Sequence, residues 1–110
     1  MTQFLFGTHG RWIAFRRNED DRYLFDKHGR WIGWFPWNDG EAVTKGGKYL
    51  GSIVGNRFVR FNNRPYQGYP GYPGYPGYPG YPGYPGYAGY RYLPGARDIE
   101  FSDDDELVED

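Results

Sequence analysis

The fold of this chain follows from a motif that reads YLFDKHGRWIGW at residues 23–34. The same motif occurs without gaps as FLFGTHGRWIAF at residues 4–15, an offset of 19 residues. A third copy begins 18 residues further on, at residues 41–52, and reads EAVTKGGKYLGS, with Lys for Arg, Tyr for Trp and Leu for Ile. Self-similarity at a nearly fixed period indicates several copies of one small structural unit.

Each copy predicts a β-hairpin, because two short apolar runs flank a four-residue segment that ends in glycine. In the second copy, Asp26 suits the first place of a type I turn, where its carboxylate accepts a backbone hydrogen bond. Gly29 suits the last place, where the left-handed conformation is needed. No helical periodicity is present, so the chain is expected to be all-β. The hairpins are expected near residues 4–17, 23–35 and 41–54, with a partial fourth unit at 56–66.

A different repeat follows, in which residues 68–85 hold six successive Gly-Tyr-Pro triplets. Proline at every third place removes backbone donors and fixes φ, so residues 67–92 are expected to be disordered and to sample extended, polyproline-like forms. They are either an insertion within the fourth unit or a linker to a loose tail. We favour an insertion, because Ile99 and Phe101 in a returning final strand at residues 93–102 would then share a buried face.

Composition and charge narrow the function. The chain has 110 residues, of which 24 are aromatic (12 Tyr, 8 Phe and 4 Trp), and this length leaves room for one small domain. Because it has no Cys, disulfides and thiolate chemistry are excluded. Residues 1–66 hold 11 Lys or Arg against 6 Asp or Glu, whereas residues 67–110 hold 2 against 8. The acidic tail at residues 103–110 is either a disordered, solvated end or a segment that folds back on the basic body and competes with an anionic ligand.

The second strand of each expected hairpin carries apolar groups on both faces. Alternation places Trp12 with Ala14 on one face and Ile13 with Phe15 on the other. A sheet with one wet face would show a cleaner polar alternation. The strands are therefore expected to be covered on both sides, within a closed, shallow barrel from which the hairpins splay outward.

These motifs resemble the four-fold β-flower domains of bacteria, in which hairpin petals surround a short symmetric barrel. The resemblance rests on HGRWI at residues 9–13 and 28–32, with a weaker GGKYLG at residues 46–51, and it covers residues 1–66. It implies a pseudo-four-fold symmetric shallow barrel of antiparallel β-hairpins. A broader likeness of that family to Tubby-type barrels implies lipid or membrane-surface binding. The degraded fourth unit and the Gly-Tyr-Pro insert depart from the family pattern.

Two sets of equivalent residues are the candidate ligand-binding positions. Rotational symmetry would gather the aromatic set into a ring around the barrel axis, where the rings either form the core or line a pocket at the barrel mouth. The basic set precedes it in sequence and is either solvated or a collar that binds phosphate, a lipid headgroup or nucleic acid. The aromatic set is Trp12, Trp31 and Tyr49, and the basic set is Arg11, Arg30 and Lys48.

The sequence gives little support to catalysis or metal binding. His9 and His28 occupy turn positions where exposed polar residues are expected, and two turn histidines are too few ligands for zinc. Ser52 and Ser102 are the two serines of the chain, and neither lies in a motif that would activate a nucleophile. We therefore expect no enzyme, no metal and no cofactor.

The expected function is that of a non-enzymatic binding or interaction module, whose aromatic and basic barrel engages an anionic small ligand, a lipid headgroup or a protein partner. One alternative is a structural protein that self-associates through the tyrosines of residues 68–90. Another is weak nucleic-acid binding through the RFVRF run at residues 57–61, which also reads as an ordinary strand. No spanning segment or signal peptide is expected, so the default location is the cytoplasm.

Overall fold

The structure of the chain is a computed structural model that describes residues 1–62 and 67–99. The regular secondary structure of these residues consists of β-strands, with no helix, so the all-β prediction is confirmed for them. The strands are β1 (Gln3–Phe6), β2 (Trp12–Arg16), β3 (Tyr23–Asp26), β4 (Trp31–Trp34), β5 (Glu41–Val43), β6 (Tyr49–Val54), β7 (Arg57–Phe61) and β8 (Ala96–Asp98).

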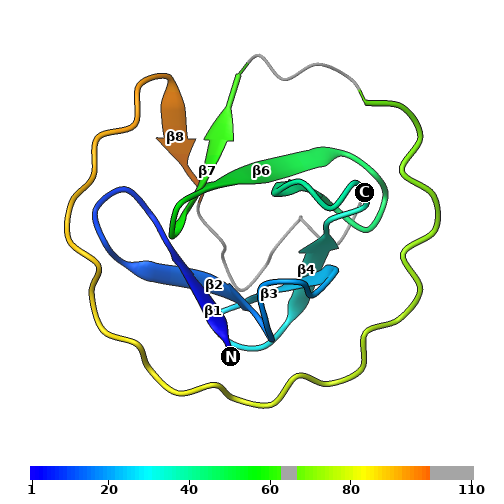
Figure 1. Ribbon diagram of the computed structural model, residues 1–110, viewed down its shortest axis with the longest axis horizontal. Helices are drawn as coiled ribbons and strands as arrows, with labels where there is room; N and C mark the ends of the chain where they lie inside the picture. The colour runs from blue at the N-terminus through cyan, green and yellow to red at the C-terminus, as the bar shows by residue number, and fades with distance from the viewer. Residues whose placement is uncertain (63–66, 100–110) are drawn as a thin grey trace.

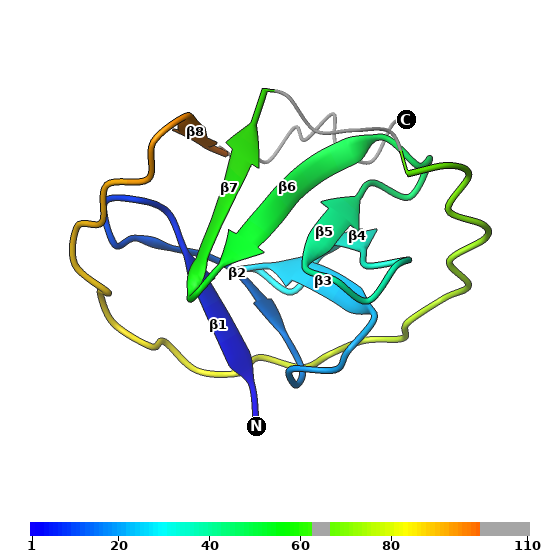
Figure 2. The same ribbon diagram turned by 45° about the horizontal axis from the view of Figure 1, so that its top comes forward.

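Seven of the strands close a barrel. Strands β1 to β7 pair antiparallel in sequence order, and β1 then pairs with β7 between Phe6 and Arg57 (Figures 1 and 2). This last pairing is parallel, because the first and last strands of an up-and-down meander with an odd number of strands run the same way. The extra strand, β8, pairs antiparallel with residues 59–61 of β7.

The three repeat motifs form three hairpins, β1–β2, β3–β4 and β5–β6, with the same turn. In each turn, the amide of the last glycine donates to the carbonyl of the first residue, and that glycine has a positive φ. In the second hairpin, Asp26 Oδ1 also accepts the His28 amide at 2.9 Å, as the turn prediction requires. The three turn bonds join Gly10 to Gly7, Gly29 to Asp26 and Gly47 to Thr44, at 3.0, 2.9 and 3.0 Å.

A β-bulge next to each turn breaks the alternation that the sequence suggests. In the first hairpin, Leu5 pairs with Ala14 but Phe6 pairs with Trp12, so Ile13 is the extra residue. The same shift occurs at the equivalent place in the other two hairpins. An extra residue reverses the side to which the chain points, so Trp12 and Ala14 lie on opposite faces of the wall and not on one face.

The two faces of the wall carry different side chains. Each of the seven barrel strands contributes a buried residue to a cluster that we call the inner core, so this cluster fills the inside of the barrel. Aromatic rings gather on the other face of β1–β4, in what we call the outer cluster. The inner core is Leu5, Ala14, Leu24, Ile32, Phe35, Ala42, Leu50, Phe58 and Ile99; the outer cluster is Phe6, Trp12, Phe15 and Phe25, with Phe4, Tyr23, Trp31 and Ala88 packed against it.

Residues 67–92, which we call the belt, run around the barrel as one extended segment (Figure 1). The glycines of the triplets all have φ between 77° and 100°, so the belt bends at each triplet and is not a straight polyproline helix. Tyr23 Oη donates to the Pro73 carbonyl at 2.6 Å, and Arg17 Nη1 donates to the Pro76 carbonyl at 2.9 Å. The prediction of a disordered insert is not confirmed, because the outer cluster and these donors give the belt a surface to lie on.

The belt keeps register with the hairpin repeat. The turn glycines of the third and second hairpins lie against Pro70 and Pro79, and the first turn binds Ala88, whose amide donates to the Gly10 carbonyl at 2.9 Å. These three belt positions are nine residues apart, which is three triplets for each hairpin. Ala88 stands where the triplet pattern would place a proline, and a proline there would lack the N–H that Gly10 binds.

After the belt, β8 returns the chain to the barrel beside β7. Its Asp98 carboxylate accepts the amide and the hydroxyl of Thr8 at 2.7 and 2.8 Å, so the first turn, like the second, has a carboxylate bound to it. Ile99 is buried in the inner core. Phe101, which we expected to share a buried face with Ile99, lies outside the described residues, as does the acidic tail at 103–110.

Candidate functional site

The three equivalent aromatics lie on the outer side of the barrel. Trp12 Nε1 and Trp31 Nε1 each donate to the carbonyl two residues further along the strand, both at 2.9 Å. The Tyr49 hydroxyl is hydrogen-bonded to the Ser52 hydroxyl at 2.7 Å. The structure therefore spreads these residues around the outside of the wall and does not gather them at the axis, which the inner core fills.

Belt tyrosines cover two of these aromatics. The Trp12 ring contacts both Tyr81 and Tyr84, with ring centroids 6.2 and 6.0 Å away. The Trp31 ring meets Tyr75 edge-on at 6.1 Å. Pairs of rings at such separations attract each other beyond simple burial, so the equivalent tryptophans are docking points for the belt.

The three equivalent basic residues have different surroundings. Arg30 Nε donates to the buried Asp26 carboxylate at 2.7 Å and so stabilises its own turn. Lys48 is exposed on the third hairpin. Arg11 is exposed as well, but it also lines a cavity. Arg30 and Lys48 do not line this cavity, so the three basic residues do not form a common collar around a ligand there.

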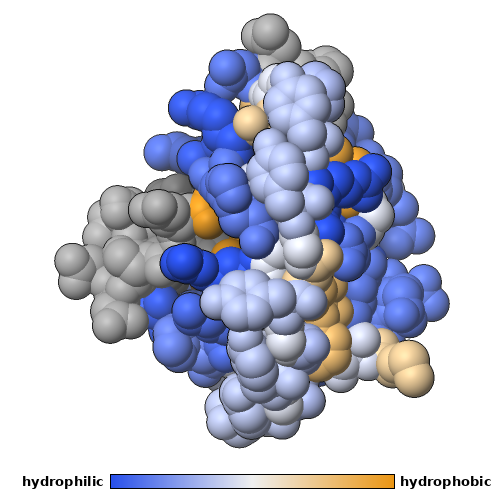
Figure 3. Space-filling model, turned by 90° about the vertical axis from the view of Figure 1, so that its left-hand side faces the viewer, coloured by the Kyte–Doolittle hydropathy of each residue, from blue (hydrophilic) through white to orange (hydrophobic). Residues whose placement is uncertain are grey.

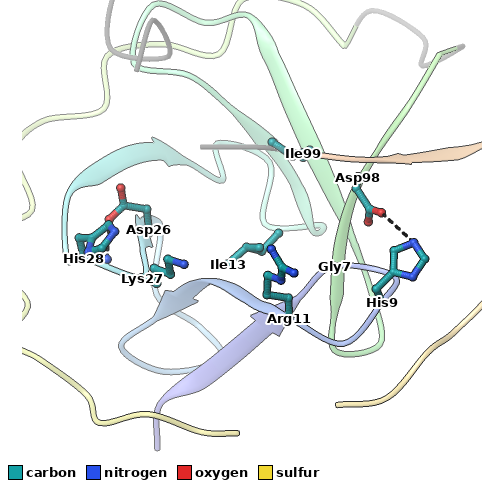
Figure 4. A pocket seen from close by; sticks show the side chains of 9 residues that line it. All are labelled: Gly7, His9, Arg11, Ile13, Asp26, Lys27, His28, Asp98 and Ile99. Atoms are coloured by element: carbon teal, nitrogen blue, oxygen red, sulfur yellow. Dashed lines mark hydrogen bonds and ion pairs between the residues drawn. The ribbon is translucent and has the colours of Figure 1, made fainter. Parts of the chain in front are cut away.

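This cavity, of about 500 Å³, lies between the turns of the first two hairpins and the end of β8 (Figure 4). Arg11 lies at its centre in this view, with Lys27 and His28 to one side and His9 and Asp98 to the other. A cavity of this size suits a small organic ligand. Its lining is Gly7, His9, Arg11, Ile13, Asp26, Lys27, His28, Asp98 and Ile99.

The carboxylates of the cavity are already engaged, whereas two of its cations are not. Asp26 binds Arg30 and two backbone amides, and Asp98 binds Thr8 and lies 4.0 Å from His9 Nε2. Within the described part of the chain, no hydrogen bond or ion pair engages the Arg11 guanidinium or the Lys27 ammonium. The donors of Arg11 and Lys27 are therefore available to an anion, while the oxygens of the two carboxylates beside them already accept hydrogen bonds.

A second cavity, of about 460 Å³, adjoins the first and shares Arg11, Lys27 and His28 with it. Its other side is aromatic, formed by Trp12 and three tyrosines of the belt. Figure 3 shows the face of the molecule along which this part of the belt runs, as a band of pale side chains with both hydrophilic and hydrophobic groups beside it. The tyrosines that line this cavity are Tyr81, Tyr84 and Tyr87.

Of the residues that line these cavities, Arg11 and Trp12 were predicted from the sequence as ligand-binding positions. Lys27, Asp98 and the two histidines were not. His9 and His28 were expected to be solvated turn residues, and both are indeed exposed, but they also face the same cavity. The available signal was the tip sequence Lys27-His28, because neighbouring hairpins of a barrel bring their tips together. Asp98 had no comparable signal, since its place depends on where β8 returns.

The RFVRF run at residues 57–61 is engaged in the fold. Arg57 is buried, and its Nη1 donates to the carbonyls of Gly7 and Gly89 at 3.1 and 2.6 Å, while its Nη2 donates to that of Ala88 at 3.1 Å. Arg60 Nε donates to the Leu50 carbonyl at 3.0 Å. These two arginines therefore contribute hydrogen bonds to the barrel and the belt.

Within residues 1–62 and 67–99, no three His, Asp or Glu side chains are placed to hold a metal ion together. The same residues include no helix that could cross a membrane. No family model matches the chain, and the searches of curated proteins and of solved structures also gave no match.

Proposed function

We propose that this protein is a non-enzymatic binding module that takes an anionic small ligand into the cavity at Arg11. The observation that carries the proposal is the pair of cations, Arg11 and Lys27, that line a cavity of about 500 Å³ while its two carboxylates are bound elsewhere. Arginine presents several donors in a fixed plane and suits phosphate or carboxylate oxygens, and lysine adds a mobile point charge. Free phosphate and a lipid headgroup share this chemistry.

A binding experiment on the full chain tests the proposal and separates the two sources of phosphate. Calorimetric titration uses inorganic phosphate, and sedimentation uses vesicles with and without phosphatidylinositol phosphate. We expect Arg11→Gln and Lys27→Gln each to weaken phosphate binding about tenfold, and added salt to weaken it in the parent protein. Lys48→Gln is the matched control, because Lys48 holds the equivalent position to Arg11 on the third hairpin and is exposed.

Equal losses in Lys48→Gln and Arg11→Gln would show non-specific attraction and contradict the proposal. Phosphate binding without vesicle binding would assign the cavity to a free ligand. Vesicle binding that Arg11→Gln abolishes would assign it to a headgroup.

We also propose that the chain is a β-flower-type domain with pseudo-four-fold symmetry. In support, three hairpins repeat the same turn and the same bulge, and β7 pairs with β8 as a fourth antiparallel pair that carries the belt between its strands. An experimental structure tests this directly. The proposal fails if β7 and β8 cannot be superimposed on the other three pairs by successive quarter turns about one axis.

A second candidate function is self-association through the belt. Nine tyrosines between residues 69 and 92 are 64 to 84% exposed, an unusually long row of aromatic rings on a protein surface. Such rings can bind arginines of another copy by cation–π contacts. We expect the double change Tyr72→Ser with Tyr78→Ser, at two of the most exposed rings, to reduce concentration-dependent association measured by light scattering. Association unchanged in this variant would remove the belt as its cause.

A further inference from the structure

The two cavities at Arg11 form one composite site, and we propose that its ligand is a nucleoside monophosphate, with the phosphate on the basic wall and the base among the belt tyrosines. This inference rests on the proposed function, because it needs the basic wall to bind an anion. It goes further by giving the ligand a second, planar part and a place to bind it.

The shared wall is the first step of the argument. Arg11, Lys27 and His28 line both cavities, so an anionic group bound to them can carry a substituent into either one. On one side of the wall the cavity is lined by turn and strand residues such as His9 and Ile13, and on the other by aromatic rings. A ligand with an anionic end and a flat, weakly polar end matches this arrangement better than an anion alone.

The aromatic side is built for a flat ring. Tyr81, Tyr84 and Tyr87 are 68, 64 and 74% exposed, less than the 81 to 84% of the four earlier belt tyrosines, so they are turned partly toward the barrel. Tyr81 and Tyr84 both contact Trp12, whose indole N–H donates to the Ala14 carbonyl at 2.9 Å. A nucleobase has a π-face that stacks on such rings, and the tyrosine hydroxyls can bind its polar edge.

The dimensions agree with this assignment. The cavities measure about 500 and 460 Å³, and each is within the range that holds a small organic ligand. The basic wall and the tyrosines line the same second cavity, so a molecule with its base one sugar away from its phosphate can contact both. The belt takes part in the site, which gives the register between belt and barrel a functional consequence.

Calorimetric titration of the full chain with three probes tests the inference. The probes are inorganic phosphate, ribose 5-phosphate and adenosine monophosphate, which add the sugar and then the base to one anionic group. We expect adenosine monophosphate to bind roughly five- to a hundredfold more tightly than ribose 5-phosphate, the range of one base–aromatic stack. Tyr84→Leu and Tyr87→Leu should remove this difference and leave phosphate binding unchanged. Tyr72→Leu is the control, because Tyr72 also belongs to a Gly-Tyr-Pro triplet but does not line the cavity.

The outcomes separate this inference from the function on which it rests. Equal affinities for ribose 5-phosphate and adenosine monophosphate, both weakened by Arg11→Gln, would overturn the nucleotide assignment and leave the anion site standing. Failure of all three probes to bind would overturn both. Tyr87 makes no ring contact with Trp12 among the described pairs, so Tyr87→Leu still tests the site if Tyr84→Leu loosens the belt.

Discussion

Ala88 shows how one residue fixes the belt on the barrel. Six identical triplets could slide along the outer cluster in steps of three residues with little change in contacts. Ala88 breaks the pattern and supplies the amide that donates to Gly10 at 2.9 Å, while its carbonyl accepts Arg57 Nη2 at 3.1 Å. Ala88, where proline is replaced, therefore helps to set the register of the belt, together with the bonds of Gly89 and Arg91 to the barrel.

We expect Ala88→Pro to release this end of the belt, because proline has no amide hydrogen to give to the Gly10 carbonyl. The lost bond should cost about 1 kcal/mol of the free energy of unfolding, measured by urea denaturation, and should speed proteolytic cleavage near Tyr87 and Tyr90. Ala88→Ser keeps the amide and is the control. Identical cleavage of Ala88→Pro and Ala88→Ser would contradict the role of this bond.

Asp21 gives the free energy of unfolding a dependence on pH. Burial by itself would raise the pKa of its carboxyl, but hydrogen bonds from the Arg17 side chain, the Arg17 amide and the Tyr23 amide outweigh burial and hold the pKa below its usual value. The Arg17 guanidinium lies 2.6 Å away. The unfolded chain therefore takes up a proton at this carboxyl before the folded chain does as the pH falls.

The contribution of Asp21 should be complete above the pKa of the unfolded carboxyl, about 3.9, and be lost as the pH falls through its lower pKa in the folded chain. Urea denaturation between pH 6 and pH 2.5 measures it. Asp21→Asn should be less stable at pH 6 and should show a flatter acid limb. An acid limb as steep as that of the parent would show that other carboxyls cause the loss.

At the level of the hairpin, the bulge decides which residues can be large. The residue after the bulged one is Ala14 in the first hairpin but Gly33 in the second and Gly51 in the third. A side-chain carbon at Gly33 would lie 2.5 Å from the Val43 carbonyl oxygen. The neighbouring strand thus comes close at the second hairpin, where the small residue is a requirement of packing.

Gly33→Ala should destabilise the protein by roughly 1 to 3 kcal/mol, because the added methyl must displace the backbone of β5. Thermal or urea denaturation measures the loss. Gly46→Ala is the matched control, since Gly46 lies in an exposed turn and has no positive φ. A Gly33→Ala protein as stable as its parent would mean that the strands can separate at little cost.

At the scale of the whole molecule, Arg57 joins the barrel, the first turn and the belt. It sits on the strand that closes the barrel against β1, and its guanidinium donates to carbonyls of the first turn and of the belt. The arginine is buried and gains these bonds in place of water, so its removal takes a charged donor from the carbonyls of Gly7, Ala88 and Gly89.

We expect Arg57→Gln to lower the free energy of unfolding by at least about 2 kcal/mol, since bonds to a charged donor are worth more than neutral ones. Amide hydrogen exchange should accelerate at Ala88 and Arg91, whose amides bind the first turn at 2.9 and 2.7 Å. Arg97→Gln is the control, because Arg97 is exposed on β8. Faster exchange throughout the barrel but not at the belt would contradict the role assigned to Arg57.

The local structure of the hairpins could be predicted from the sequence, because short-range chemistry controls it. Asp26 and Gly29 predict a turn within four residues, and the two other copies of the motif predict the same turn. The faces of Trp12 and Ala14 could not be predicted, because alternation assumes a regular strand and one inserted residue reverses it. The cavity could be predicted only in part. The repeat identified Arg11 as a candidate ligand-binding residue, but the residues around it come from other elements of the fold.

The sequence by itself therefore determined the strands, the turns and their repetition, all of which depend on contacts within a few residues. Tertiary structure decided which side of the wall each ring occupies, where β8 returns, and that the belt lies against the barrel in a register of three triplets to a hairpin. These features depend on surfaces that exist only after the barrel has closed. The site at Arg11 belongs to this second group, because two hairpin tips, β8 and the belt must meet to form it.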